Sequence, residues 1–189
     1  MMDELSLNIL DIAQNSIAAE AKNVEIIISE NDSEDTLIIS IKDNGKGMTP
    51  EFLSKVEDPF VTTRTTRKIG LGISFFKEAA EMTGGSLKLD STPGVGTVIT
   101  ATFQKSHIDR QPIGDLTGTI IALVTLNPDI DFILEYRICK ENRENDNVFI
   151  FSTVEVKDML GGDIALSNPE IASFLTQYLN EHLENLKVS

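Results

Sequence analysis

A chain of 189 residues that is 41% hydrophobic can bury the core of one domain, or of one domain with a smaller appendage. Its 30 acidic and 16 basic residues give a net charge of −14, which argues against sequence-independent binding to nucleic acid because such binding needs a basic face. The single cysteine, Cys139, excludes an intramolecular disulfide framework and a cysteine-rich metal site.

The first residues, MMDELSLN, have neither the basic region nor the apolar stretch of a signal peptide. No apolar run in the chain reaches the roughly 18 residues that a membrane span needs. We therefore expect a cytoplasmic location and no membrane partner.

The first predicted element is a helix from about residue 4 to residue 19. Apolar and small residues at helical spacing form one stripe along it: Leu5, Ile9, Ile12 and Ser16. Polar residues three and four positions apart form another face: Asn8, Asp11 and Asn15.

Two strands are expected next, over residues 23–29 and 36–43, and the polar turn ENDSED separates them. The loop DNGKGM follows the second strand and starts with Asp43. A short helix is predicted to open at Pro50, with Thr49 as its amino-terminal cap.

The densest basic cluster of the chain comes next, in the segment VTTRTTRK, and is where a polyanion would be bound. A loop entering a helix is predicted over GLGISFFKEAAEMTGG, ending at the Gly84-Gly85 pair. The alternating runs SLKLDS and TVITATF, joined by TPGVG, predict paired strands.

The chain changes character near residue 110, so we expect one domain over residues 1–106 and a small α+β region over residues 107–189. The second region is predicted to hold a buried helix over 113–127 and strands over 130–138 and 147–153. A final helix is predicted to start at Pro169, with Asn168 as its cap.

The loop DNGKGM places a carboxylate at the end of a strand, with glycines two and four residues later. This spacing does not fit a calcium loop, and the chain contains no GxxxxGK[ST] phosphate loop. Taken alone, the loop is typical of an Asp-capped surface turn.

Five segments together resemble the GHKL superfamily, the ATP-binding fold shared by histidine kinases, gyrase-type topoisomerases, heat-shock chaperones and mismatch-repair ATPases. The segments occur in the family's order: LDIAQNSIAAEAKNVEI, DNGKGM, DPFVTTR, GLGI and GVGT. The resemblance covers residues 4 to about 104 and implies an α/β sandwich with helices on one face of a mixed sheet. The superfamily's first strand is missing, so either the sheet lacks one strand or the C-terminal region supplies a replacement.

The resemblance implies that Asp43 accepts a hydrogen bond from the adenine amino group and thereby selects ATP over GTP. It also implies that Gly45 and Gly47 let the backbone pass close to the base. The expected ATP-binding residues are Asn15, Asp43, Gly45, Gly47, Met48, Lys68, Gly70, Leu71, Gly72, Ile73 and Thr97.

The resemblance further implies a magnesium ion held by the amide oxygen of Asn15, the only protein ligand expected because magnesium keeps several waters. Asp11, one helical turn earlier, stands where ATPase members carry a water-activating Glu and where kinases carry a residue that assists the acceptor. The alternative for Asp11 and Asn15 is a solvated polar face of the helix.

The glycines of GLGI are expected to present backbone amides at a helix N-terminus to the triphosphate. Lys68 stands where the family pattern GxGLG has its first glycine, and is expected to stiffen the lid or contact a phosphate. Only TTRTTRKI separates the phenylalanine-bearing segment from GLGI, which indicates a short lid and an open site.

Three function classes remain open on these residues. The first, which we favour, is a kinase module that phosphorylates a partner protein in trans, because four residues before the first helix leave no room for a phosphoacceptor hairpin. The second is a slow ATPase whose nucleotide state switches an interaction, and the third is a non-catalytic ATP sensor. The acidic C-terminal region, with its apolar helices, is expected to form a docking surface or a homodimer contact.

Overall fold

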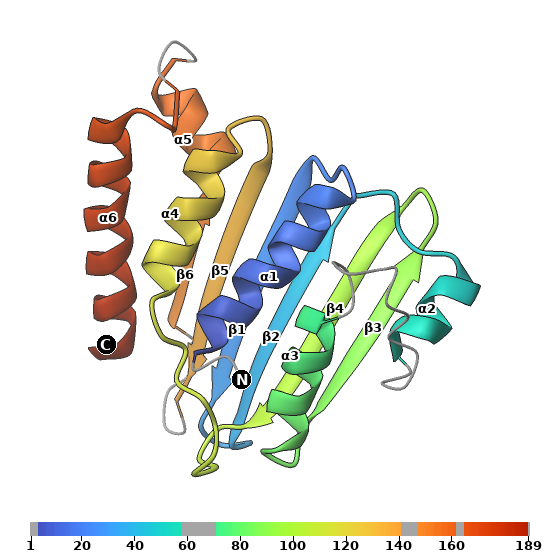
Figure 1. Ribbon diagram of the computed structural model, residues 1–189. Helices are drawn as coiled ribbons and strands as arrows, with labels where there is room; N and C mark the ends of the chain where they lie inside the picture. The colour runs from blue at the N-terminus through green and yellow to red at the C-terminus, as the bar shows by residue number, and fades with distance from the viewer. Residues whose placement is uncertain (1–3, 58–70, 141–146, 162–164, 189) are drawn as a thin grey trace.

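A computed structural model describes residues 4–57, 71–140, 147–161 and 165–188. Six helices and six strands lie within these ranges (Figure 1). In chain order they are α1 (Leu5–Ala18), β1 (Asn23–Asn31), β2 (Thr36–Asp43), α2 (Pro50–Glu57), α3 (Leu71–Glu81), β3 (Ser86–Thr92), β4 (Gly96–Gln104), α4 (Leu116–Leu126), β5 (Asp131–Cys139), β6 (Asn147–Ser152), α5 (Thr153–Met159) and α6 (Pro169–Val188).

The strands form one mixed sheet in the order β3-β4-β2-β1-β5-β6. All neighbouring pairs are antiparallel except β1 and β5, which run parallel over the register from Asn23 opposite Asp131 to Asn31 opposite Cys139. The expected mixed sheet is therefore confirmed. The C-terminal region contributes β5 and β6 to it, so this region extends the sheet instead of leaving it short.

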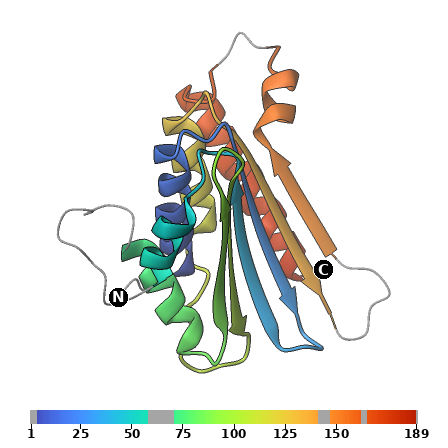
Figure 2. The same ribbon diagram turned by 90° about the vertical axis from the view of Figure 1, so that its right-hand side faces the viewer.

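Helices α1, α3 and α4 cover one face of the sheet, as Figures 1 and 2 show. Alternate strand residues point to this face, so that Ile26, Ile28, Ile39 and Ile41 are each at most 1% exposed. The apolar stripe of α1 packs over them. Burial of each such side chain contributes roughly 1.5–3 kcal/mol to folding. The prediction that helices lie on one face of the sheet is thus confirmed.

The C-terminal region is joined to the sheet by specific contacts as well as by strand pairing. Tyr136 on β5 is 1% exposed, and its hydroxyl donates a hydrogen bond of 2.5 Å to Glu30 on β1. Helix α4 packs against α1, and α6 packs against α4 and β6.

None of the helices within the described residues combines the length and the apolar character that a membrane-spanning helix needs.

The predicted elements within the described residues are present, although the helix predicted over 113–127 begins only at Leu116. One further difference lies at the end of β6. The strand expected over residues 147–153 ends at Ser152, and α5, which was not predicted, begins directly at Thr153. The Thr153 hydroxyl accepts a hydrogen bond from the Phe132 amide at 2.8 Å, which holds the start of α5 against β5. The predicted caps are present: Thr49 Oγ1 accepts from the Phe52 amide at 3.3 Å, and Asn168 Oδ1 accepts from the Glu170 amide at 2.8 Å.

Candidate functional site

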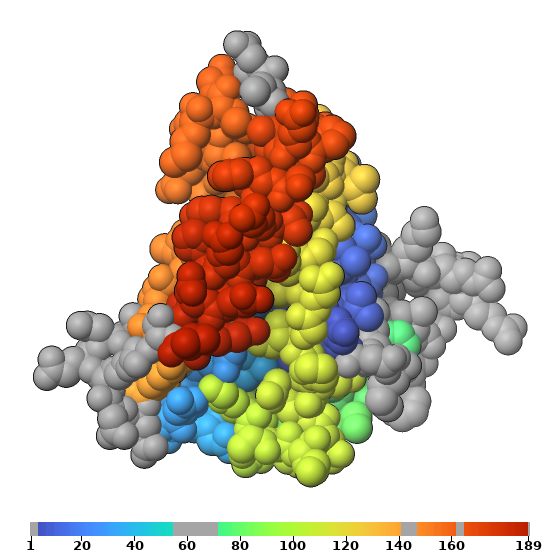
Figure 3. Space-filling view, turned by 90° about the vertical axis from the view of Figure 1, so that its left-hand side faces the viewer, coloured from blue at the N-terminus to red at the C-terminus, as the bar shows by residue number. Residues whose placement is uncertain are grey.

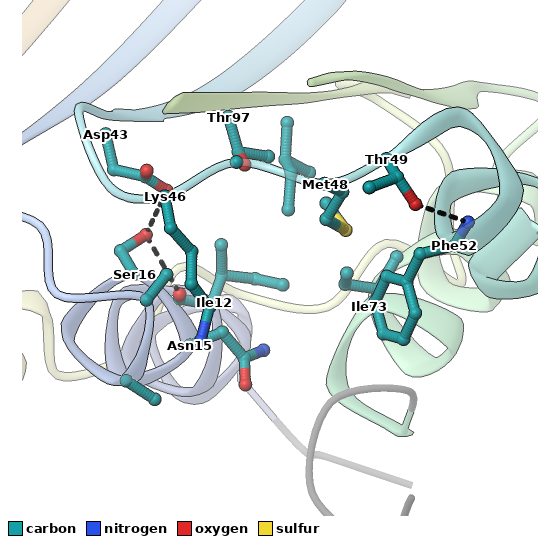
Figure 4. Close-up of a pocket in the computed structure, with 14 residues that line it drawn as sticks. Ile12, Asn15, Ser16, Asp43, Lys46, Met48, Thr49, Phe52, Ile73 and Thr97 are labelled. Carbon is teal, nitrogen blue, oxygen red and sulfur yellow. Dashed lines mark hydrogen bonds between the residues drawn. The ribbon is translucent and has the colours of Figure 1, made fainter. Parts of the chain in front are cut away.

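A cavity of about 400 Å³ lies between α1, the DNGKGM loop, α2, α3 and β4 (Figure 4). Its size falls in the range typical of small-molecule sites. Apolar side chains dominate its wall, with a few polar groups among them. The lining residues are Ile12, Asn15, Ser16, Ala18, Ala19, Asp43, Lys46, Gly47, Met48, Thr49, Phe52, Ile73, Thr97 and Ile99.

Asp43 is a buried carboxylate whose orientation is fixed by two hydrogen bonds. It ends β2 and is 9% exposed. Its Oδ2 accepts from the Ser16 hydroxyl at 2.6 Å, and its Oδ1 accepts from the Gly45 amide at 2.9 Å. Because an ionised carboxylate can accept about four hydrogen bonds, Asp43 retains capacity to accept one from a ligand.

Thr97 lies beside Asp43 because the two residues are directly paired across β2 and β4. It is 8% exposed, and its hydroxyl shares a hydrogen bond of 2.9 Å with the Ser91 hydroxyl. Ser91 also accepts from the Met48 amide at 2.9 Å. This chain of bonds ties the DNGKGM loop to the β3–β4 hairpin and so fixes one side of the cavity wall that the loop forms.

The loop glycines permit a close approach to protein backbone. A Cβ on Gly45 would lie 2.7 Å from the Ala19 carbonyl oxygen. Gly47 has a φ of +64°, and a Cβ there would lie 2.0 Å from the Thr92 carbonyl oxygen. The loop therefore passes between the end of α1 and the β3–β4 turn, a route that a side chain at Gly47 would block.

The Asp11 carboxylate lies against the first turn of α3. A Cβ on Gly72 would fall 1.6 Å from Asp11 Oδ2, so only glycine allows this approach. Burial raises the pKa of the Asp11 carboxyl above its ordinary value of 3.8 because it disfavours the charged form.

Asn15 faces the cavity, and its buried Nδ2 has no hydrogen-bond partner among the described residues. A buried polar atom without a partner is unfavourable, which is consistent with completion by a ligand. Asn8, predicted on the same helix face, is only 1% exposed, so this face of α1 is not simply solvated.

The structure brings most of the predicted site residues to one place. Asn15, Asp43, Gly47, Met48, Ile73 and Thr97 line the cavity. Gly45 borders it through its bond to Asp43, and Gly72 lies beside Asp11. Leu71 begins α3, whereas Lys68, Gly70 and the DPFVTTR segment lie outside the described residues.

Eight further cavity-lining residues were not predicted as site residues: Ile12, Ser16, Ala18, Ala19, Lys46, Thr49, Phe52 and Ile99. The sequence could have indicated Ser16, because a serine within the apolar stripe of a helix is expected to be buried and then needs a hydrogen-bond partner. Lys46 stands between the two loop glycines, and in Figure 4 its side chain points across the cavity toward α1. The position of Phe52 depends on how α2 packs, which no local pattern reveals.

Comparison with known proteins agrees with this geometry. The family model described as "Histidine kinase-, DNA gyrase B-, and HSP90-like ATPase" matches residues 1–107. Sensor histidine kinase WalK of Bacillus subtilis (strain 168) is 36% identical over 108 residues, covering 53% of this chain and 18% of the relative. Sensor histidine kinase ZraS of Salmonella typhi is 32% identical over 99 residues, covering 52% of this chain and 21% of the relative. This chain thus spans about one fifth of the length of these relatives.

Among solved structures, the Aquifex aeolicus MutL ATPase domain complexed with ADP is similar at a TM-score of 0.44 and 15% identity, covering 77% of this chain and 64% of that one. That likeness is too weak to bear on function. The family match, in contrast, extends over more than half of the 189 residues and contains every cavity-lining residue. The chain therefore belongs to the family of histidine kinase-, DNA gyrase B- and HSP90-like ATPases, a membership that supports ATP binding.

Proposed function

We propose that this chain binds ATP with magnesium in the cavity and transfers the terminal phosphoryl group to a partner protein in trans. The observation that carries the proposal is Asp43, a buried carboxylate oriented by two donors at the wall of a cavity of about 400 Å³. The kinase reading is supported by matched relatives that are themselves sensor histidine kinases.

Adenine recognition follows from the chemistry of Asp43. Adenine presents an amino donor where guanine presents a carbonyl acceptor, so a carboxylate with free acceptor capacity favours adenine. Guanine would place an oxygen against a buried oxygen, and such an unpaired contact is costly. Met48 and Ile73 would provide apolar contacts to the base.

A magnesium ion fits the residues present. Asn15 lines the cavity, and its amide Oδ1 is the atom that would bind magnesium, while its unpartnered Nδ2 would be free to donate to a phosphate oxygen. No group of three acidic, His or Cys residues in the described ranges forms an alternative metal site. Magnesium commonly uses one or two protein ligands and completes its shell with water and phosphate. When bound, it would neutralise phosphate charge; Asn15 would orient it.

Lys46 and the start of α3 would face the phosphates. Of the residues lining the cavity, Lys46 is the only cation, and its ammonium has no partner in the described part of the chain. A helix N-terminus also favours negative charge, and α3 begins at Leu71, next to the Asp11 carboxylate.

Asp11 would take the proton from the acceptor group as the phosphoryl group leaves ADP and bonds to the acceptor. Its raised pKa brings the carboxylate closer to the basicity of an effective general base. The same property favours a second candidate, a slow ATPase in which water is the acceptor.

The test is to measure Mg-ATP binding by calorimetry and phosphate release by the isolated chain in parallel. If the wild type binds Mg-ATP but releases no phosphate, and Asp43→Asn binds Mg-ATP more weakly, the kinase is supported. The isolated chain would then lack only the partner protein that accepts the phosphoryl group. Release that is lost in both Asp43→Asn and Asp11→Asn identifies the slow ATPase instead. Failure of the wild-type chain to bind ATP would overturn the proposal entirely.

A further inference from the structure

A second hollow, of about 240 Å³, lies among β6, α5 and α6, outside the residues that match the family. We call it the α5–α6 groove. Figure 3 shows α5 in orange beside α6 in red on this face of the molecule. We call the cavity beside Asp43, which is proposed above to bind ATP, the nucleotide cavity. It has no lining residue in common with the α5–α6 groove.

Large apolar side chains of the groove are left in solvent. Met159 is 83% exposed, Phe174 is 63% exposed and Ile150 is 54% exposed, and one side chain comes from each of α5, α6 and β6. Single exposed apolar residues are ordinary, but three that line one hollow are typical of an interaction site.

The aromatic wall of the groove is held in place before any partner arrives. The Phe174 ring stacks on Tyr178 at a centroid distance of 6.3 Å and an interplanar angle of 23°. Tyr178 in turn contacts His182 at 4.1 Å, and His182 stacks on Phe149 of β6. Such a fixed aromatic side chain loses little conformational entropy on binding and is suited to anchor a partner.

The charged side chains exposed at or near the groove are acidic. Glu155 is the one charged residue among those that line it, and Asp158 and Glu170 are exposed on the same two helices. These three carboxylates have no ion-pair partner within the described ranges. The nearby cation, Lys157, is bound to Asp131 on β5 at 2.7 Å.

We propose that the α5–α6 groove binds a basic amphipathic helical segment of a partner protein. Apolar side chains of that segment would pack between Met159 and Phe174, and its Lys or Arg side chains would lie near Glu155 and Glu170, as in other helix-in-groove complexes. A second copy of this chain is the weaker occupant: a two-fold contact sets the same acidic surface against itself, and each copy carries a net charge of −14.

The experiment uses the full chain and two fluorescent peptides of about 18 residues, long enough for five helical turns. Both peptides carry Leu at helical spacing; one has Lys at every polar position and the other has Glu. We expect saturable binding of the Lys peptide by fluorescence anisotropy at physiological ionic strength. No binding of the Lys peptide, or equal binding of both peptides, would overturn the proposal.

Matched variants assign the binding to the groove. Phe174→Gln and Met159→Gln are each expected to weaken binding about tenfold. Their controls, Phe75→Gln and Met82→Gln, alter exposed residues of the same type that line neither hollow, and are expected to leave binding unchanged. An equal loss of peptide affinity in the groove variants and in the controls would show that the peptide does not bind in the groove. Two separate groove variants guard against one that folds poorly, which circular dichroism would detect.

Charge and self-association are tested separately. Glu155→Gln should weaken binding about threefold and reduce its dependence on salt. Sedimentation velocity of the wild type over a range of concentrations should show a monomer. A dimer that Phe174→Gln dissociates would make a second copy the occupant and overturn the proposal.

Discussion

The nucleotide cavity and the α5–α6 groove are both apolar hollows on the same sheet, but they hold their carboxylates differently. Asp43 is 9% exposed and fixed by Ser16 and Gly45, whereas Glu155 is exposed and has no ion pair in the described part of the chain. A fixed, buried carboxylate discriminates between donors by geometry, because a mismatched ligand leaves it unpaired. An exposed carboxylate only attracts opposite charge, a weaker and less exacting selection.

The two hollows also depend on each other through the fold. Strand β1 lies between β2, which ends in Asp43, and β5, which is paired with β6. Helix α1, which carries Asp11 and Asn15, packs against α4 of the C-terminal region. The following predictions test how far the two regions can be separated, beginning with the largest effect.

Removal of residues 107–189 is expected to abolish cooperative folding. It would uncover the edge of β1 and the face of α1 that α4 covers, a loss comparable with the whole stability of about 5–15 kcal/mol of a typical domain. Thermal unfolding followed by circular dichroism measures the effect. A truncated chain with a sharp transition near that of the wild type would show that residues 1–106 fold independently.

Asp43→Asn is expected to weaken ATP binding about 100-fold, because an amide cannot accept from adenine, Ser16 and Gly45 as the carboxylate does. Calorimetry measures the affinity. Asp90→Asn serves as the control and should bind ATP normally, because it alters an exposed carboxylate on β3 that pairs with Lys88. Peptide binding in the α5–α6 groove should be unaffected, and a parallel loss there would mean that the two sites are coupled.

Gly47→Ala is expected to destabilise the protein by about 3 kcal/mol, because its Cβ would meet the Thr92 carbonyl oxygen and its φ is positive. Gly84→Ala separates these two causes. Gly84 has a φ of +73° but no atom within 4 Å of an added Cβ, so about 1 kcal/mol is expected. Urea unfolding gives both values; equal losses would mean that the loop moves freely away from the β3–β4 turn.

Lys46→Met is expected to weaken ATP binding about tenfold and to leave adenosine binding unchanged, because the variant keeps most of the unbranched side chain but loses its charge. Competition titrations with ATP, ADP and adenosine measure the difference. If the affinity for adenosine falls as much as the affinity for ATP, Lys46 contacts the nucleoside and not the phosphates.

Asp11→Asn is expected to raise the stability slightly at neutral pH, the smallest effect of the series. Because burial raises the pKa of Asp11, the folded state keeps this proton to higher pH than the unfolded chain, and stability falls as pH rises through the interval above 3.8. Asparagine does not titrate, so the gain should vanish below that interval. Melting temperatures of both proteins across acidic to neutral pH test this; an equal difference at every pH would exclude titration as the cause.

The sequence predicted the nucleotide cavity far better than the groove, and the reason is physical. Asp43, Gly47 and Asn15 belong to sequence segments that resemble those of an ATP-binding family. The structure brings all three residues to one cavity. The contact between Ser16 and Asp43 spans 27 residues, and only the fold reveals it. The roles of Lys68 and Gly70 stay predictions, since both lie outside the described residues.

In the C-terminal region, the spacing of apolar residues was sufficient to predict α4, β5, β6 and α6, but it did not predict how these elements pack together. Helix α5 was missed because its sequence, TVEVKDM, contains β-branched residues and follows β6 with no turn residue between them. A strand supplied by the C-terminal region was one of two alternatives that the sequence left open, but the parallel pairing of β5 with β1 was not predicted. The groove itself arises from three elements packed together, and no local pattern encodes it.

The pairing of β1 with β5 has a consequence for how the chain is made. Tyr136 and Glu30, which share a hydrogen bond across these strands, are 106 residues apart in sequence. During synthesis, β1 therefore leaves the ribosome long before its parallel neighbour exists, and one of its edges stays open. Such distant pairings form slowly, and open edges invite aggregation. Glu25 and Glu30 place charged side chains on β1, and charged side chains on an open edge disfavour its pairing with another chain.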